Sequence, residues 1–208
     1  MTDPRERLLS AAIDHVAAHG LADLSLRGLA AAIGTSHRML IYHFGSKEGL
    51  LVALIRAVEQ RQRDALAQLE LAPGATPADL GRAFWRRLTD PALWPHERLF
   101  FEVYGQALQG RRGTTALLDG IVTDWLVPLV ELGVRHGFSR DEAESTARLG
   151  LAVTRGLLLD LLATGDRAGV DAAMERFITL TYERSGTSPA RTRPGRSRAA
   201  GPAGTPDR

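Results

Sequence analysis

Residues 24–51, LSLRGLAAAIGTSHRMLIYHFGSKEGLL, decide the fold of this chain. Apolar residues recur at helical spacing between Leu26 and Ile33, and Gly34 then supplies the permissive backbone that ends a helix. Ser25 can cap this helix, because its hydroxyl can accept a hydrogen bond from an unpaired N–H of the first turn. The segment predicts two short helices joined by a tight turn, followed by the start of a longer helix.

The second predicted helix follows Thr35 and Ser36 and has two different sides. Leu40 and Phe44 are four residues apart, so they share the side expected to pack inward. The opposite side is expected to carry His37, Arg38, Ile41 and Tyr42. Gly45 is expected to end the helix, and Ser46 can cap the next one.

This arrangement predicts a helix-turn-helix, whose second helix can enter the DNA major groove. Residues 35–47 contain basic and histidine side chains but no carboxylate. Such a bias suits DNA, because phosphates repel acids and a guanidinium matches the O6/N7 edge of guanine. The alternative is a small helical subdomain with an exposed polar face. The expected DNA-binding residues are Ser25, Arg27, Thr35, Ser36, His37, Arg38, Ile41, Tyr42, His43 and Lys47.

The same residues resemble the DNA-binding head of the tetracycline-repressor (TetR/AcrR) family of bacterial transcription regulators. The resemblance is carried by Leu26-Arg27, Leu29-Ala30, Ile33-Gly34 and the run YHFGSKEGLL at residues 42–51, which is a highly specific signature of that family. It covers residues 1–55 in detail, and beyond them only the length and the helical layout agree.

Two positions depart from the family pattern. Ile41 stands where the family usually has an aromatic residue, often a tyrosine, that contacts the DNA backbone. Gly28 replaces a residue that is commonly acidic, so Ser25 lacks the partner of a capping box. The resemblance otherwise implies a dimer on a palindromic operator, in which a ligand displaces the helix that joins head and body and thereby resets the heads.

Composition places the chain among cytosolic proteins. Its 208 residues suffice for one full core and a small appended domain, and there is no cysteine. No signal-peptide layout is present and no stretch reaches the ~18 apolar residues of a membrane helix, so we expect a cytoplasmic protein without a membrane partner. The net charge of +2 is misleading, because residues 186–208 hold five arginines and one aspartate, which leaves a slightly acidic body.

An all-α fold with three parts is expected. The first part is the DNA-binding domain at residues 1–48, in which an initial helix carries Leu9, Ile13 and Val16 on its apolar side. His15 and His19 have a metal-ligand spacing, but without a nearby carboxylate or thiol set we expect two polar residues near a helix end, and neither metal nor cofactor. The other parts are a ligand-binding and dimerisation domain at residues 49–185 and a disordered basic tail at residues 186–208.

One long helix at residues 47–71 is expected to join head and body. The apolar periodicity of the body then predicts helices at residues 78–88, 96–109, 115–136, 139–164 and 170–182. Pro128 lies inside the third of these five and is expected to kink it.

Residues 149–162 are apolar nearly all round the predicted helix, which requires burial on all sides. At the edge of a helical body this indicates a partner subunit, while a central core helix in a monomer is the alternative. The expected dimer interface comprises Leu149, Ala152, Val153, Gly156, Leu157, Met174, Phe177 and Ile178.

The body is expected to bind a small apolar molecule in a pocket lined by aromatic side chains. The candidates are Phe84, Phe100, Phe101, Tyr104 and Trp125. An enzyme is not expected, because the chain has no cysteine nucleophile, no G-x-S-x-G, no H-E-x-x-H and no phosphate loop. The sequence therefore predicts a dimeric, ligand-responsive repressor, and the alternative is a helical small-molecule-binding or scaffold protein with a non-functional DNA head.

Overall fold

The computed structural model of the chain describes residues 3–20, 24–70 and 74–183. Every regular element in these ranges is helical, which confirms the all-α prediction. The elements are α1 (Pro4–His19), α2 (Leu26–Ala32), α3 (His37–Phe44), α4 (Lys47–Glu70), α5 (Pro77–Leu88), η1 (Pro91–Leu93), α6 (Trp94–Leu108), η2 (Thr115–Leu118), α7 (Thr123–Arg135), α8 (Arg140–Thr164), α9 (Arg167–Ile178) and η3 (Thr179–Glu183). The predicted basic tail lies outside the described residues.

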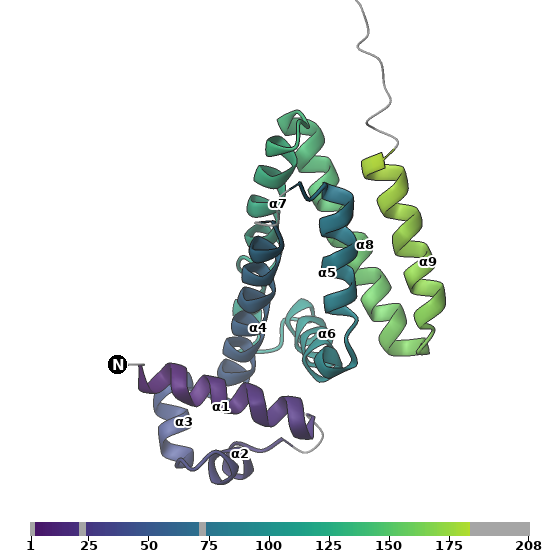
Figure 1. Cartoon of the computed structure of the whole chain (residues 1–208). Coiled ribbons are helices and arrows are strands. Elements are labelled where there is room, and N and C mark those ends of the chain that lie inside the picture. The colour runs from purple at the N-terminus through teal and green to yellow at the C-terminus, as the bar shows by residue number, and fades with distance from the viewer. Residues whose placement is uncertain (1–2, 21–23, 71–73, 184–208) are drawn as a thin grey trace, which may run out of the picture.

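The long helix α4 connects a small head to a larger body (Figure 1). Its 24 residues correspond to about 36 Å at ~1.5 Å per residue. Helices α1, α2 and α3 gather around the first turns of α4, and α4 contacts the body through α5, α6 and η2 (Figure 1). This confirms the prediction of one helix shared between the two parts.

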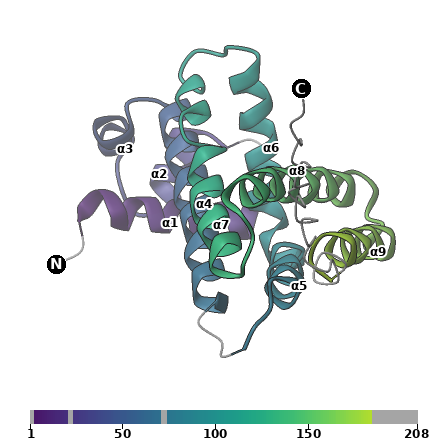
Figure 2. The same cartoon turned by 90° about the horizontal axis from the view of Figure 1, so that it is seen from above.

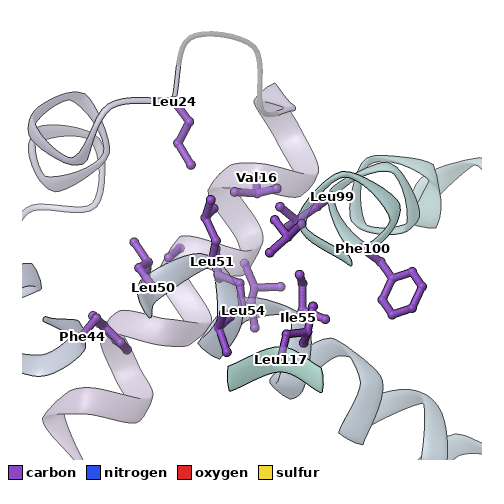
Figure 3. Packing of buried hydrophobic residues seen from close by; sticks show 14 of the residues in the cluster. Val16, Leu24, Phe44, Leu50, Leu51, Leu54, Ile55, Leu99, Phe100 and Leu117 are labelled. Atoms are coloured by element: carbon purple, nitrogen blue, oxygen red, sulfur yellow. The ribbon is translucent and has the colours of Figure 1, made fainter. Parts of the chain in front are cut away.

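One apolar core joins the head to the body. Val16 of α1 and Leu50 and Leu54 of α4 pack in the same buried cluster as Leu99 of α6 and Leu117 of η2 (Figure 3). Burial of such side chains is worth about 1.5–3 kcal/mol each, so the contact between head and body is a strong one. Helices α1, α4 and α6 therefore share one core.

A second core lies between α5, α8 and α9. It is built around Trp85, Leu158, Leu161, Met174 and Ile178. Helix α7 packs along α8 through a third, smaller cluster. Helices α8 and α9 lie on the side of the body away from α2 and α3 (Figure 2).

The prediction of a continuous helix at residues 115–136 is wrong. The chain forms the short η2, turns, and begins α7 only at Thr123. Gly120 has a φ of +83°, a left-handed conformation that a helix cannot contain and that glycine adopts without steric cost. Pro128 does lie inside α7, as predicted.

Candidate DNA interface and ligand cavity

The helix-turn-helix is formed by α2 and α3, and serine side chains cap both helices. Ser25 Oγ accepts a hydrogen bond from the Gly28 N–H at 3.0 Å, and Ser36 Oγ accepts one from the Met39 N–H at 3.1 Å. Gly34 has a φ of +69° in the turn between them. Both hydroxyls keep their own O–H group, so each can still donate to a phosphate.

The two sides of α3 are arranged as the sequence predicted. Leu40 and Phe44 are buried against α1 and α4. The opposite side is solvent-exposed, up to 78% for Tyr42, and it carries His37, Arg38, Ile41 and Tyr42. No carboxylate belongs to this helix.

The signature run GSKEGLL fixes the start of α4 against the end of α3. Ser46 Oγ accepts from the Gly49 N–H at 3.0 Å. A Cβ atom at Gly49 would lie 2.1 Å from the carbonyl oxygen of Phe44, so only glycine permits this approach. Lys47 is consequently exposed in the first turn of α4, beside α3.

The remaining predicted DNA-binding residues differ in exposure. Arg27 is exposed on α2. Thr35 is half-buried in the turn, where its N–H donates to the carbonyl oxygen of Ala30 at 2.8 Å. His43 is also half-buried, and within the described part of the chain its Nε2 has no hydrogen-bond partner.

The body encloses a cavity of about 130 Å³ between α4, α5, α6, α7, α8 and α9. One water needs roughly 10–15 Å³ on the same measure, so the cavity has room for an organic molecule. Four predicted aromatic residues line it, namely Phe84, Phe100, Phe101 and Trp125. The ring of Phe100 points away from the leucine cluster of the head (Figure 3).

Tyr104 does not line this cavity, and a role for it in ligand binding stays a prediction. Tyr104 lies one turn of α6 beyond Phe100, with its ring centroid 5.4 Å from that of Phe100 and 5.7 Å from the guanidinium carbon of Arg155. The two rings and the guanidinium pack on one another, and Tyr104 is absent from the cavity lining. The sequence suggested Tyr104 because it is aromatic and has a polar hydroxyl, but residue type could not show where the cavity ends.

Charged side chains also line the cavity, and sequence reasoning missed them. Glu59 of α4 accepts a hydrogen bond from Trp125 Nε1 at 2.5 Å and lies 3.6 Å from Arg155 of α8. Arg155 in turn donates to the carbonyl oxygen of Ile121 at 2.7 Å. Glu97 of α6 completes this charged cluster.

The two acids of the cluster have raised pKa values. Burial, together with the nearby negative charge of Glu59, raises the pKa of Glu97 to about 8, and Arg155 opposes this only in part. Burial also raises the pKa of Glu59, against the lowering effects of Trp125 and the two arginines Arg155 and Arg63. This raised pKa favours the protonated, neutral form of Glu97 at neutral pH.

A sequence signal for part of this cluster existed. Glu59 and Gln62 occupy inner positions of α4 between the buried Ile55 and Leu66, at spacings of four, three and four. Polar residues on an apolar stripe indicate either a buried polar contact or a ligand site.

Some residues of the predicted dimer interface are exposed, and others are buried in the core of the single chain. Leu149, Ala152 and Gly156 are exposed on α8. Val153, Leu157 and Phe177 are half-buried against the second core. The inclusion of Met174 and Ile178 was wrong, because they are only 4% and 1% exposed within a single chain, packed beneath α5 and α8.

The two histidines of α1 stack on each other. Their ring centroids are 4.3 Å apart, and His19 Nδ1 donates to the carbonyl oxygen of His15 at 3.0 Å. Among the described residues, no group of three or more histidine, cysteine, aspartate or glutamate side chains could hold a metal ion. The same residues include no helix with the length and apolarity of a membrane span.

A helix-turn-helix head on a helical body that encloses a cavity defines the class of helical transcription regulators. Residues 8–54 match the family model described as bacterial regulatory proteins, tetR family. This match covers the head of the chain, which is therefore similar to the DNA-binding domain of that family. A curated relative, the HTH-type transcriptional regulator BetI of Stenotrophomonas maltophilia (strain R551-3), is 32% identical over 79 residues, which cover 38% of this chain and only 40% of that relative.

Solved structures extend the likeness to the body. A transcriptional regulator from Rhodococcus sp. Rha1 is 23% identical, with a TM-score of 0.68 over 86% of this chain and 96% of its own. The multidrug binding protein EbrR, solved in complex with imidazole, is 28% identical, with a TM-score of 0.61 over 90% of this chain and 93% of its own.

Proposed function

We propose that this regulator is a dimeric repressor that leaves a palindromic operator when a small molecule enters the body cavity. The observation that carries the proposal is the exposed side of α3, where Arg38 and His37 stand beside Ile41 and Tyr42 without any carboxylate. A recognition helix needs such a face. The protein is expected to act on DNA in the cytoplasm and to catalyse no reaction.

Individual contacts follow from position on the two helices. Arg38, near the start of α3, reads a base edge, and Arg27 of α2 makes a second base or phosphate contact. Ile41 meets a thymine methyl group. The phosphates on either side of the groove are held by Lys47 with Ser25, Thr35, Ser36, Tyr42 and His43.

The dimer is supported by an exposed stripe along α8. Leu149 and Leu159 are 52% and 51% exposed, although both are large apolar residues. With Ala152 and Gly156 they follow a 3-4-3 spacing, which is the spacing of a helix seam that packs against a partner helix. Around Gly156 no atom lies within 4 Å of a built Cβ, so a partner backbone can approach closely there. Pairing of α8 and α9 from two subunits would form a four-helix interface.

The link between cavity and head is supported by α4 and α6. Both helices line the cavity, and both pack on α1. At the start of α6, His96 Nε2 donates to the carbonyl oxygen of Ile13 in α1 at 3.4 Å. A ligand that binds better when α4 and α6 are displaced lowers the DNA affinity by the same coupling free energy. EbrR, which is described as multidrug-binding, supports a small-molecule role for the body.

The test is a mobility-shift assay with the DNA that flanks the gene of this protein. Arg38→Ala should reduce operator affinity by about 1–3 kcal/mol and affinity for random DNA much less. An equal loss on both DNAs would assign Arg38 to phosphate. Absence of any specific shift with the wild type would instead favour the small-molecule-binding or scaffold protein with a non-functional head.

Sedimentation tests the dimer. Gly156→Glu should yield helical monomers that no longer bind the operator, because the substitution buries an unpaired charge at the closest approach. Gln68→Glu adds the same charge to an exposed position of α4 and serves as the control. A wild-type monomer at micromolar concentration would refute both the dimer and the two half-sites, which are expected about 34–36 Å apart or at a multiple of that distance.

A further inference from the structure

Glu97 is a buried acid whose carboxyl group has no direct partner among the described residues, and Arg155 offsets its charge only in part. Its side chain belongs to a residue only 7% exposed, and it lines the cavity. Within residues 3–20, 24–70 and 74–183 it makes no hydrogen bond and no ion pair, whereas Glu59 has both Trp125 and Arg155. Ionising a buried carboxyl group that has no partner is costly, and the position of Glu97 in the cavity wall allows a ligand to supply that partner.

Arg155 is not the partner of the Glu97 carboxylate, because its guanidinium already contacts other groups. It pairs with Glu59, donates to the carbonyl oxygen of Ile121, and lies with its guanidinium carbon 5.1 Å from the centroid of Phe100. The charges of Arg155 and Glu59 cancel each other. An ionised Glu97 therefore leaves one negative charge in the cavity wall.

The surrounding walls suit a cation with an apolar body. Phe84 and Trp125 form a tilted pair with centroids 5.7 Å apart, and Phe100 and Phe101 form an edge-to-face pair at 5.2 Å. All four rings line the cavity with Glu97. Aromatic faces attract cations, most strongly where water is excluded.

We propose that the ligand of this cavity is an organic monocation with an apolar or aromatic body, whose charged nitrogen pairs with the carboxylate of Glu97. The proposal rests on the proposed function and specifies the chemistry of its ligand. It replaces the expectation of a purely apolar molecule with one that carries a single positive charge.

Binding of such a cation expels a proton. Before the cation binds, the protonated form of Glu97 is favoured at neutral pH, because burial and Glu59 raise its pKa to about 8. When the cation enters, Glu97 releases this proton to solvent and keeps the electron pair as a carboxylate. The charged groups that act on Glu97 come from two of the elements packed on α6, namely Glu59 from α4 and Arg155 from α8. The short helices η1 and η2 contain no titratable side chain, and the printed contact of α1 with His96 is through a backbone carbonyl.

The test compares two probes of the same shape. Benzyltrimethylammonium carries a fixed positive charge, and neopentylbenzene replaces the nitrogen with carbon. Binding to the full-length protein is followed by titration calorimetry and by intrinsic tryptophan fluorescence, to which Trp85 and Trp125 in the cavity wall contribute. The quaternary nitrogen does not titrate, so any pH dependence of its Kd reports on the protein.

The cation should bind at least about tenfold more tightly than the hydrocarbon at pH 8.5, through charge and cation–π attraction. Its Kd should weaken about 25-fold between pH 8.5 and pH 6.5, since a pKa of about 8 makes proton release part of binding. Calorimetry in buffers of different ionisation enthalpy should detect up to one released proton at pH 6.5. These wild-type measurements need no variant to fold.

Substitutions locate the effect. Glu97→Gln should abolish the pH dependence and the preference for the cation, while leaving the Kd of neopentylbenzene unchanged. Glu97→Asp should restore part of both. Glu102→Gln, an exposed position on the same helix, is the matched control and should behave as the wild type.

Equal affinity for the two probes, no binding of either, or a Kd of the cation independent of pH would overturn the proposal. Operator binding without any probe is measured in parallel. Specific operator binding combined with failure of the cation to bind would overturn the ligand class and leave the DNA-binding function standing. Tight cation binding that leaves the operator affinity unchanged would support the cation site and overturn ligand-controlled repression.

Discussion

Glu97→Gln should stabilise the fold, and increasingly so as the pH rises. The carboxyl of Glu97 has an ordinary pKa of 4.5 when the chain is unfolded and a pKa of about 8 when it is folded. Between pH 4.5 and pH 8 the carboxyl is therefore protonated in the folded state and ionised in the unfolded state. The stabilising contribution of this proton is complete below pH 4.5 and is lost as the pH rises through 8.

The magnitude follows from the same two values. Their difference, at about 1.36 kcal/mol per pKa unit, corresponds to a loss of about 5 kcal/mol from the free energy of unfolding. A glutamine has the shape of the protonated acid and no charge, so Glu97→Gln avoids this loss. The difference in stability between variant and wild type should grow towards about 5 kcal/mol above pH 8 and be small near pH 5.

Urea unfolding followed by circular dichroism measures this difference at fixed protein concentration. Other titrating groups, including Glu59, are present in both proteins, so most of their effect cancels in the comparison. Glu102→Gln is the control and should follow the wild type at every pH. If the stabilities of wild type and Glu97→Gln run parallel from pH 5 to pH 8.5, Glu97 is not held protonated and the reasoning from burial is refuted.

Three further outcomes are expected. Lys47→Ala should weaken binding to all DNA and reduce the slope of log Kd against log salt by about one, and an unchanged slope would remove Lys47 from the phosphate contacts. Ile41→Tyr should raise general DNA affinity and relax the preference at one base pair, as measured on a set of operator variants; an unaltered preference would mean that Ile41 reads no base. Met174→Ala should reduce the free energy of unfolding by about 2–5 kcal/mol in urea, because Met174 is core, whereas Leu180→Ala at an exposed position should change it by less than about 1 kcal/mol. Dissociation of the dimer by Met174→Ala without loss of subunit stability would contradict the assignment of Met174 to the core.

The head could be predicted from the sequence because short-range rules govern it. The caps at Ser25 and Ser36 act over three residues, and the close approach at Gly49 involves a carbonyl only five positions away. The inward and outward sides of α3 follow from helical spacing alone. Local sequence thus contains nearly all the information that shapes this unit.

The arrangement of the body could not be predicted in the same way, because it depends on contacts between residues far apart in the chain. Glu59, Glu97 and Arg155 come from α4, α6 and α8, and only their packing places them in one cavity with Trp125. Helical spacing could assign Tyr104 to a side of α6 but not to the cavity wall, and it could show that Met174 and Ile178 are apolar but not which neighbour covers them. The sequence by itself determined the helices, their order and the DNA-binding face, because these depend on hydrogen bonds and side-chain spacing within a few turns. Only the tertiary structure decided which side chains are core, surface or cavity, because burial and the resulting pKa of a group such as Glu97 are set by the elements that pack around it.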